Sequence, residues 1–188
     1  ARNSLGGTGT QTAALAFGGQ PPNTAVTELY NGSSWTEVND LNTARNGPGG
    51  FGTSTSSLAY GGEGGAPNPK NETELWNGTN WTEVNNLNNT GKYIGRAGTD
   101  STAGLAVSGI GPDNSTPVAN VELWNGANWT ETTDVNTARD NLGGSGTSTA
   151  ALAFGGTPPV KANTELWNGS NWTEVNDLNT ARNLLAGT

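Results

Sequence analysis

Eight glutamates recur at two fixed places of a repeated segment, and paired carboxylates are the groups with which glycoside hydrolases cleave their substrates. The two sets are Glu28, Glu74, Glu122 and Glu165, and Glu37, Glu83, Glu131 and Glu174. Because catalysis needs one asymmetric pair with shifted pKa values, carboxylates in four equivalent settings do not define an active site. We therefore expect solvated strand edges at these positions and predict that the protein is not an enzyme.

Arginines recur as well, and three of them have an aspartate five residues upstream. The arginines are Arg2, Arg45, Arg139 and Arg182, and the aspartates are Asp40, Asp134 and Asp177. One interpretation is a ligand site for anions or sugars, formed where these side chains face a central opening. The alternative is structural, because a planar guanidinium is well suited to bridge loop carbonyls or a glutamate between neighbouring units.

Tryptophans form pairs around an Asn-Gly turn, and exposed pairs of this kind could stack against sugar rings. The set comprises Trp35, Trp76, Trp81, Trp124, Trp129, Trp167 and Trp172. Large aromatic side chains at equivalent places of a repeat are typical of packing between the units. We therefore expect these tryptophans to be structural.

The composition argues against several kinds of partner. The net charge is −8 and no lysines or arginines cluster, whereas nucleic acids and anionic membranes attract basic surfaces. No apolar run is long enough to span a bilayer, so membrane insertion is not expected. The sequence has no cysteine or histidine and no calcium-binding loop motif, so we expect no metal site and no cofactor.

A repeat of about 45 residues organises the chain, and a fixed period of this length indicates a modular fold. The segment TELWNGSNWTEVNDLNTAR at Thr164–Arg182 recurs at Thr27–Arg45, from Thr73 onward and at Val121–Arg139. Between these copies lies a second element ending in glycine, at 12–19, 55–62, 102–109 and 149–156. Each repeat therefore combines two conserved elements and is expected to form one structural unit.

Each unit is predicted to contain four short strands. In the first unit these are Leu5–Thr10, Ala13–Phe17, Val26–Tyr30 and Trp35–Val38. Asn31-Gly32 predicts a type I′ hairpin turn, because both residues tolerate positive φ. The first strand of every unit contains mostly small residues, which suits an inner strand that is crowded near an axis.

The hydrophobic strand ending in Gly-Gly, followed by an aromatic residue, a tryptophan and an arginine, resembles the kelch repeat over essentially the whole chain. Short regular repeats of phage tail and bacterial surface proteins look similar. Three units have tryptophan where kelch repeats have tyrosine, and the unit at 73–120 reads Ser108-Gly109 in place of the glycine pair. The resemblance implies an all-β fold: a β-propeller of four kelch-like blades, each of four short antiparallel strands.

We expect one domain over residues 1–188, with units at about 27–72, 73–120 and 121–163 and a split blade made of 164–188 and 1–26. Pairing of N- and C-terminal strands in that blade would close the ring and remove exposed sheet edges. The segment Ala181–Thr188 then starts a surplus unit, since ARNLLAGT nearly repeats ARNSLGGT at Ala1–Thr8. This segment could pack on its own ring, or enter a neighbouring chain and produce a homo-oligomer.

The loops between the second and third strands vary in length, and strand alternation places them on one face with the linkers between units. Variable loops on a rigid scaffold are where recognition is usually located, although neutral drift would give the same pattern. The candidate ligand-binding residues in these loops are Glu63, Asn68, Asp113 and Asn114.

Three functions follow. The first is a non-enzymatic binding or adhesion module, extracellular or on a virion or cell surface, with a glycan as ligand. That expectation rests on the resemblance, the aromatic residues and the polar loops. The second is a purely structural repeat of a fibre or filament, and the third is a glycoside-cleaving enzyme.

Overall fold

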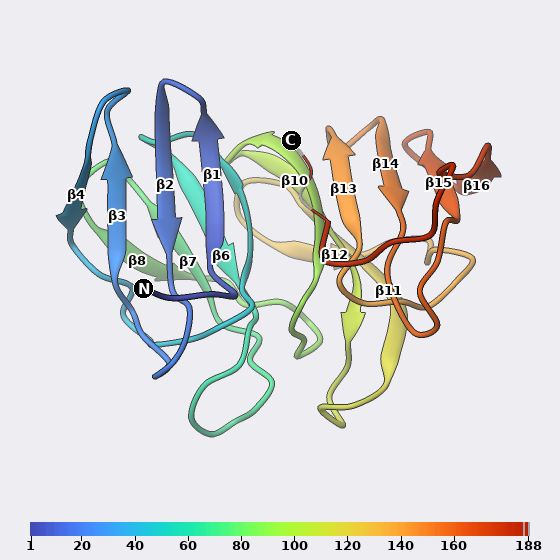
Figure 1. The fold of residues 1–188 in the computed structure, drawn as a ribbon, viewed down its shortest axis with the longest axis horizontal. Coiled ribbons are helices and arrows are strands. Elements are labelled where there is room, and N and C mark those ends of the chain that lie inside the picture. Colours follow the sequence, from blue (N-terminus) through green and yellow to red (C-terminus); the bar gives the residue numbers. More distant parts are fainter. Residues whose placement is uncertain (186, 188) are drawn as a thin grey trace.

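The computed structural model describes residues 1–185 and 187, and its strands form four antiparallel sheets of four strands each, here called blades I to IV (Figure 1). Blade I contains β1 (Gly6–Thr10), β2 (Ala13–Phe17), β3 (Thr27–Tyr30) and β4 (Trp35–Val38). Blade II contains β5 (Gly49–Gly52), β6 (Ser57–Tyr60), β7 (Thr73–Trp76) and β8 (Trp81–Val84). Blade III contains β9 (Gly95–Asp100), β10 (Ala103–Ile110), β11 (Pro117–Trp124) and β12 (Trp129–Glu131). Blade IV contains β13 (Gly143–Gly146), β14 (Ala151–Phe154), β15 (Thr164–Trp167) and β16 (Trp172–Val175).

The all-β class and the strand positions are confirmed, and the repeated sheets fit a propeller-like arrangement. The four strands predicted for the first unit agree with β1 to β4 within one residue. Within the described residues there are no helices, and hence none that is long and apolar enough to cross a membrane.

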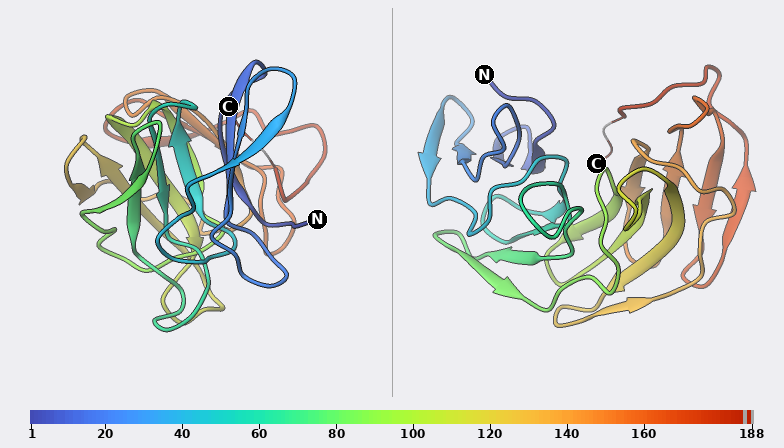
Figure 2. Two further views of the ribbon diagram at one scale, coloured as in Figure 1. Left: turned by 90° about the vertical axis from the view of Figure 1, so that its left-hand side faces the viewer. Right: turned by 90° about the horizontal axis from the view of Figure 1, so that it is seen from below.

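The predicted split blade is wrong, because each sheet is built from four consecutive strands. Strand β2 pairs with β3 of the same unit, with Ala14 opposite Tyr30, so the short local connection prevails over pairing between the ends of the chain. The blades form an arc that is open between blade I and blade IV (Figure 2, right). Closure of the ring by a shared blade is therefore not confirmed.

The inner strands are crowded, as their small residues predict. Strand β1 contacts β5, β5 contacts β9, and β9 contacts β13. A Cβ atom added to Gly50 in β5 would lie 2.6 Å from the Phe17 ring and 2.7 Å from the Leu58 carbonyl oxygen. These distances are too short for any side chain, which explains the glycine at this position.

The Asn-Gly hairpins form, but not as type I′ turns. Between β3 and β4 only Gly32 has a positive φ, and four residues separate the paired Tyr30 and Trp35. The Asn31 Oδ1 atom accepts hydrogen bonds from the backbone N–H groups of Ser33 and Ser34, each at 3.0 Å. Asn31 therefore acts through its side chain, which replaces backbone acceptors in the turn.

Candidate binding surfaces

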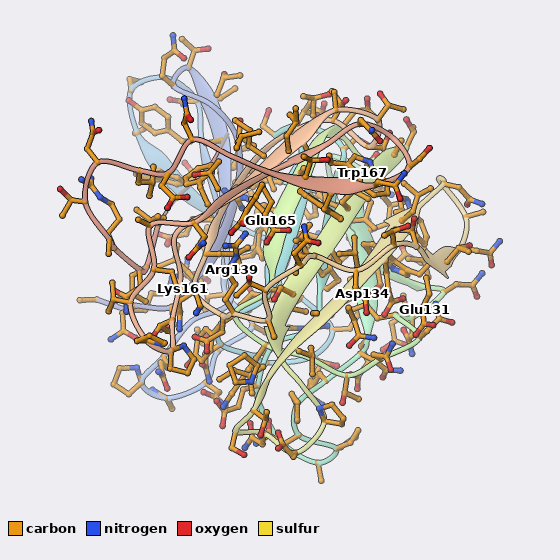
Figure 3. All side chains as sticks on the ribbon, turned by 90° about the vertical axis from the view of Figure 1, so that its right-hand side faces the viewer. Glu131, Asp134, Arg139, Lys161, Glu165 and Trp167 are labelled. Atoms are coloured by element: carbon orange, nitrogen blue, oxygen red, sulfur yellow. The ribbon has the colours of Figure 1, made fainter. Side chains whose placement is uncertain are left out.

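The recurring arginines join neighbouring blades instead of forming a surface site. Arg45 and Arg139 have no exposed surface, and each pairs with an equally buried glutamate of the following blade, Glu74 or Glu165. The Arg139–Glu165 distance is 3.0 Å, and both residues lie in the contact, here called a joint, between blade III and blade IV (Figure 3). The expectation of ligand binding by Arg45 and Arg139 is thus wrong, because neighbouring backbone covers both.

Arg2 and Arg182 differ from these two because they lie at the open ends of the arc. Arg2 pairs with Glu28 of its own blade at 2.6 Å, in a partly exposed position. The Arg182 side chain is exposed and, among the described residues, donates only to the Thr180 carbonyl oxygen, at 3.3 Å. These two arginines remain accessible to a ligand or to another chain.

The glutamates of the third strands are also not the solvated edges that we expected. Glu74, Glu122 and Glu165 are buried, since the linker of the preceding blade covers each of them. In the second joint, the contact between blades II and III, Gly91 stands where the first and third joints have arginine. The Glu122 carboxylate accepts from the backbone and side-chain N–H of Asn88, both at 2.8 Å, as the other two buried glutamates do from Asn42 and Asn136. In place of the arginine, the backbone N–H of Asn89 donates to Glu122 at 3.0 Å.

The upstream aspartates are exposed, and within the described part of the chain they make no ion pair with the arginines. The Asp40 carboxylate accepts from the backbone N–H of Thr27 at 3.0 Å, and Asp177 does the same for Thr164 at 3.3 Å. Asp134 is exposed on the corresponding linker. The structure therefore does not combine aspartate and arginine into one site, and Asp40 and Asp177 fix the start of a third strand.

Six of the seven tryptophans are at most 6% exposed, which confirms their packing role and excludes them as sugar platforms. Within a blade the rings pack closely, with centroids 5.4 Å apart for Trp76 and Trp81. The indole N–H of Trp81 donates to Thr27 Oγ1 of the preceding blade at 3.0 Å, and Trp129 donates to Thr73 Oγ1 at the same distance. The exception is Trp35, which is 50% exposed at the open end of blade I.

At the third joint the Trp172 indole nitrogen is buried and has no hydrogen-bond partner among the described residues. Val121 stands where the other joints have threonine, and both residues belong to the same buried cluster. The loss of the hydroxyl acceptor thus explains the unpaired indole.

The loop face, defined as the loops joining β2–β3, β6–β7, β10–β11 and β14–β15 together with the linkers between blades, carries a polar cluster. In Figure 1 these loops extend from the lower edge of the sheets. The Glu63 carboxylate accepts from Lys92 Nζ at 2.9 Å and from Asn68 Nδ2 at 3.3 Å. Asn114, from the loop of blade III, lies close enough to contribute to the lowered pKa of Glu63.

The electrostatics of this cluster centre on Glu63. Its pKa is lowered from 4.5, first of all because of the hydrogen bond from Lys92. One buried side-chain atom, Asn114 Oδ1, has no hydrogen-bond partner among the described residues. The cluster therefore offers a carboxylate, amides and an ammonium group close to one unsatisfied acceptor.

Three of the four loop residues predicted from the sequence meet in this cluster, and one does not. Asp113 turns back on its own loop, where Thr116 and Ser115 donate to its carboxylate and hold its pKa well below the usual range. Lys92, which binds Glu63, was missed in the prediction. Its signal is the sequence Thr90-Gly91-Lys92, which stands where the other units have Ala-Arg-Asn or Ala-Arg-Asp.

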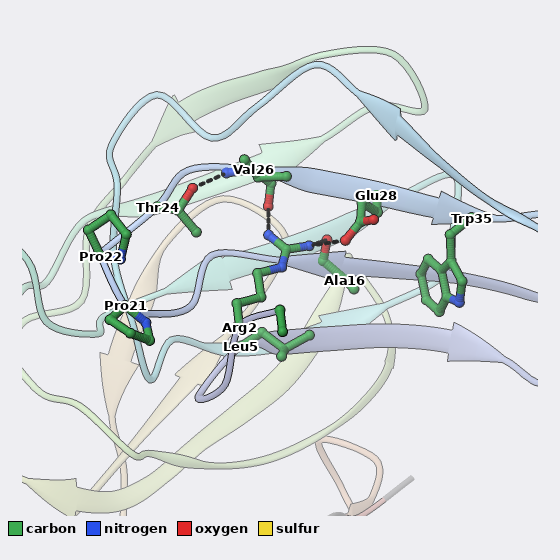
Figure 4. Close-up of a pocket in the computed structure, with 10 residues that line it drawn as sticks. Arg2, Leu5, Ala16, Pro21, Pro22, Thr24, Val26, Glu28 and Trp35 are labelled. Carbon is green, nitrogen blue, oxygen red and sulfur yellow. Dashed lines mark hydrogen bonds and ion pairs between the residues drawn. The ribbon is translucent and has the colours of Figure 1, made fainter.

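A hollow lies on the open side of blade I and has a volume of about 570 Å³. It is lined by residues that include Arg2, Leu5, Val26, Glu28 and Trp35 (Figure 4). At the three joints the corresponding surface of a blade is covered by the blade that precedes it.

The part of the chain that the structure describes contains no group of three or more acidic, histidine or cysteine residues that could hold a metal ion. Comparison with protein-family models finds no match, and a search of curated proteins finds none either.

Proposed function

We propose that the chain is a non-enzymatic binding module with a kelch-like propeller scaffold, and that its loop face binds a glycan. The observation that carries this proposal is the cluster of Glu63, Asn68, Lys92 and Asn114, which come from three separate loops. Sugar hydroxyls both donate and accept hydrogen bonds, and carboxylate, amide and ammonium groups complement them in both respects. A few converging polar groups on a rigid scaffold are typical of ligand recognition.

The setting of the cluster supports the same proposal. The β6–β7 and β10–β11 loops that contribute to it lack the Pro-Pro pair of the β2–β3 and β14–β15 loops, so the cluster is specific to blades II and III. A glycan-binding or adhesive role would place the protein outside the cell or on the surface of a virion or cell.

A glycan array probed with the purified chain tests this function. We expect binding of an oligosaccharide that Asn68→Ala weakens about fivefold, because one lost hydrogen bond costs about 1 kcal/mol. The control is Thr79→Ala in the exposed β7–β8 turn at the opposite edge, which should leave binding unchanged. Absence of binding, or binding that responds to Thr79→Ala and not to Asn68→Ala, would refute the proposal.

A structural repeat within a larger assembly is the second candidate. It is favoured by the two open ends of the arc, which leave Trp35 and Arg182 exposed.

A further inference from the structure

The three joints between blades follow one pattern. In each, a tryptophan of the later blade packs against the third strand of the earlier blade, and two of these three indoles donate to a threonine there. A linker asparagine binds the glutamate of the later blade at all three joints, and a linker arginine adds an ion pair at the first and third. These three joints therefore show which contacts cover the face of a blade when a further blade packs against it.

The last face in this series, on blade IV, is uncovered. Leu152 is 37% exposed, whereas Leu15, Leu58 and Leu105 at the same place in the other blades are at most 1% exposed. Leu166 and Val175 are also exposed there. Thr164 occupies the position of Thr27 and Thr73, but no tryptophan reaches its hydroxyl group among the described residues.

The opposite face, on blade I, is complementary, because it lacks a preceding blade instead of a following one. Trp35 occupies the position of Trp81 and Trp129 but has no preceding blade to pack against. The hollow beside it exposes Glu28, whose counterparts Glu74 and Glu165 are buried by the preceding linker. Blade I thus presents the groups that the face of blade IV lacks.

The end of the described chain continues the pattern into the start of a fifth blade. The backbone N–H of Leu184 donates to the Asn141 carbonyl oxygen at 2.9 Å, as Asn141 donates to Tyr93 and Tyr93 to Gly47. All four residues have a positive φ between 52° and 60°. The Arg182 carbonyl oxygen accepts from Gly156 at 2.9 Å, as that of Arg45 does from Gly19 at 2.8 Å. Arg182 therefore occupies the position of a linker arginine such as Arg45, but no following blade is present for it to bind.

We propose that the open face of blade IV binds blade I of a second copy of this chain, head to tail. Trp35 of the incoming copy covers the face of blade IV and donates to Thr164 Oγ1. Arg182 of the first copy pairs with Glu28 of the incoming copy and replaces Arg2, so Ala1–Leu5 of that copy leave their place. Of the predicted surplus segment, Ala186 and Thr188 lie outside the described residues.

A second copy is the occupant because blade I and blade IV of one chain lie on opposite sides of the opening (Figure 2). The place that a further inner strand would take beside blade IV already holds Gly187, next to the backbone of Gly144. Contacts of this heterologous kind repeat from copy to copy and produce rings or filaments.

The test is the particle mass in solution over a range of concentrations, by light scattering or sedimentation. We expect the full chain to associate, and Trp35→Ala and Leu166→Glu each to weaken association at least tenfold. Both side chains are exposed in the single chain, so these variants should remain folded. Thr149→Glu adds the same charge to an exposed turn of blade IV and should leave association unchanged.

Mixing the two variants tests the head-to-tail direction. A Leu166→Glu copy retains an intact blade I and a Trp35→Ala copy an intact blade IV, so the mixture should form pairs and stop there. Arg182→Ala should weaken association at least tenfold if Arg182 replaces Arg2. A single-chain mass at all concentrations, or association that is insensitive to Trp35→Ala, would overturn the proposal. Association that is insensitive to Arg182→Ala would overturn the exchange of the arginines.

Discussion

Replacing Trp81 with alanine is expected to lower the free energy of unfolding by about 3–5 kcal/mol, because removal of a buried aromatic side chain leaves a cavity. The Trp81 ring packs edge-on against Phe17 of blade I, with centroids 5.1 Å apart, so the loss affects the joint between two blades. Its indole also donates to Thr27. Denaturant unfolding followed by circular dichroism measures the change.

Trp35→Ala is the matched control, since Trp35 occupies the same place in blade I but is 50% exposed. At a concentration where the chain is monomeric, this variant should lose less than about 1 kcal/mol, as is usual away from the core. Equal losses for Trp35→Ala and Trp81→Ala would contradict the assignment of blade I as an open end.

Arg45→Met is expected to destabilise the chain by about 3–5 kcal/mol, because the fully buried Glu74 would lose its counter-charge. The Glu74 carboxylate keeps only its hydrogen bonds from Asn42, at 2.7 and 2.8 Å. Thermal or denaturant unfolding of the purified variant gives the difference.

The double variant Arg45→Met/Glu74→Leu should recover most of this loss, because apolar side chains can replace a buried ion pair at little cost. Arg182→Met, at the exposed equivalent of Arg45, should have no measurable effect on the stability of the single chain. If Arg45→Met proves as mild as Arg182→Met, the Arg45–Glu74 pair does not hold blades I and II together.

The strands could be predicted from the sequence because their signals are local. Alternating apolar residues, Asn-Gly turns and glycine pairs define the edges of each strand, and the small residues of the first strand identify the crowded side of each blade. The turn type was missed, because the Asn31 side chain supplies acceptors that residue preference alone does not reveal.

The accessibility of the candidate site residues could not be predicted, because it depends on neighbouring blades. Arg2, Arg45 and Arg182 occur in the same Ala-Arg-Asn sequence, yet only Arg45 is enclosed. For the same reason Trp35 and Trp81 differ in exposure although their flanking residues are nearly identical. The sequence at Lys92 departs visibly from the repeat, but its role depends on contacts between segments of two blades, which that local departure does not reveal.

The most direct test of the central claim, that the blades pack in series and leave one uncovered tryptophan, is hydrogen exchange at the seven indole N–H groups by nuclear magnetic resonance. In dilute solution we predict rapid exchange for Trp35 alone and slow exchange for the other six. At concentrations where copies associate, Trp35 should become protected. Protection of all seven indoles in a monomeric species would show that the ring closes within one chain and would contradict the account.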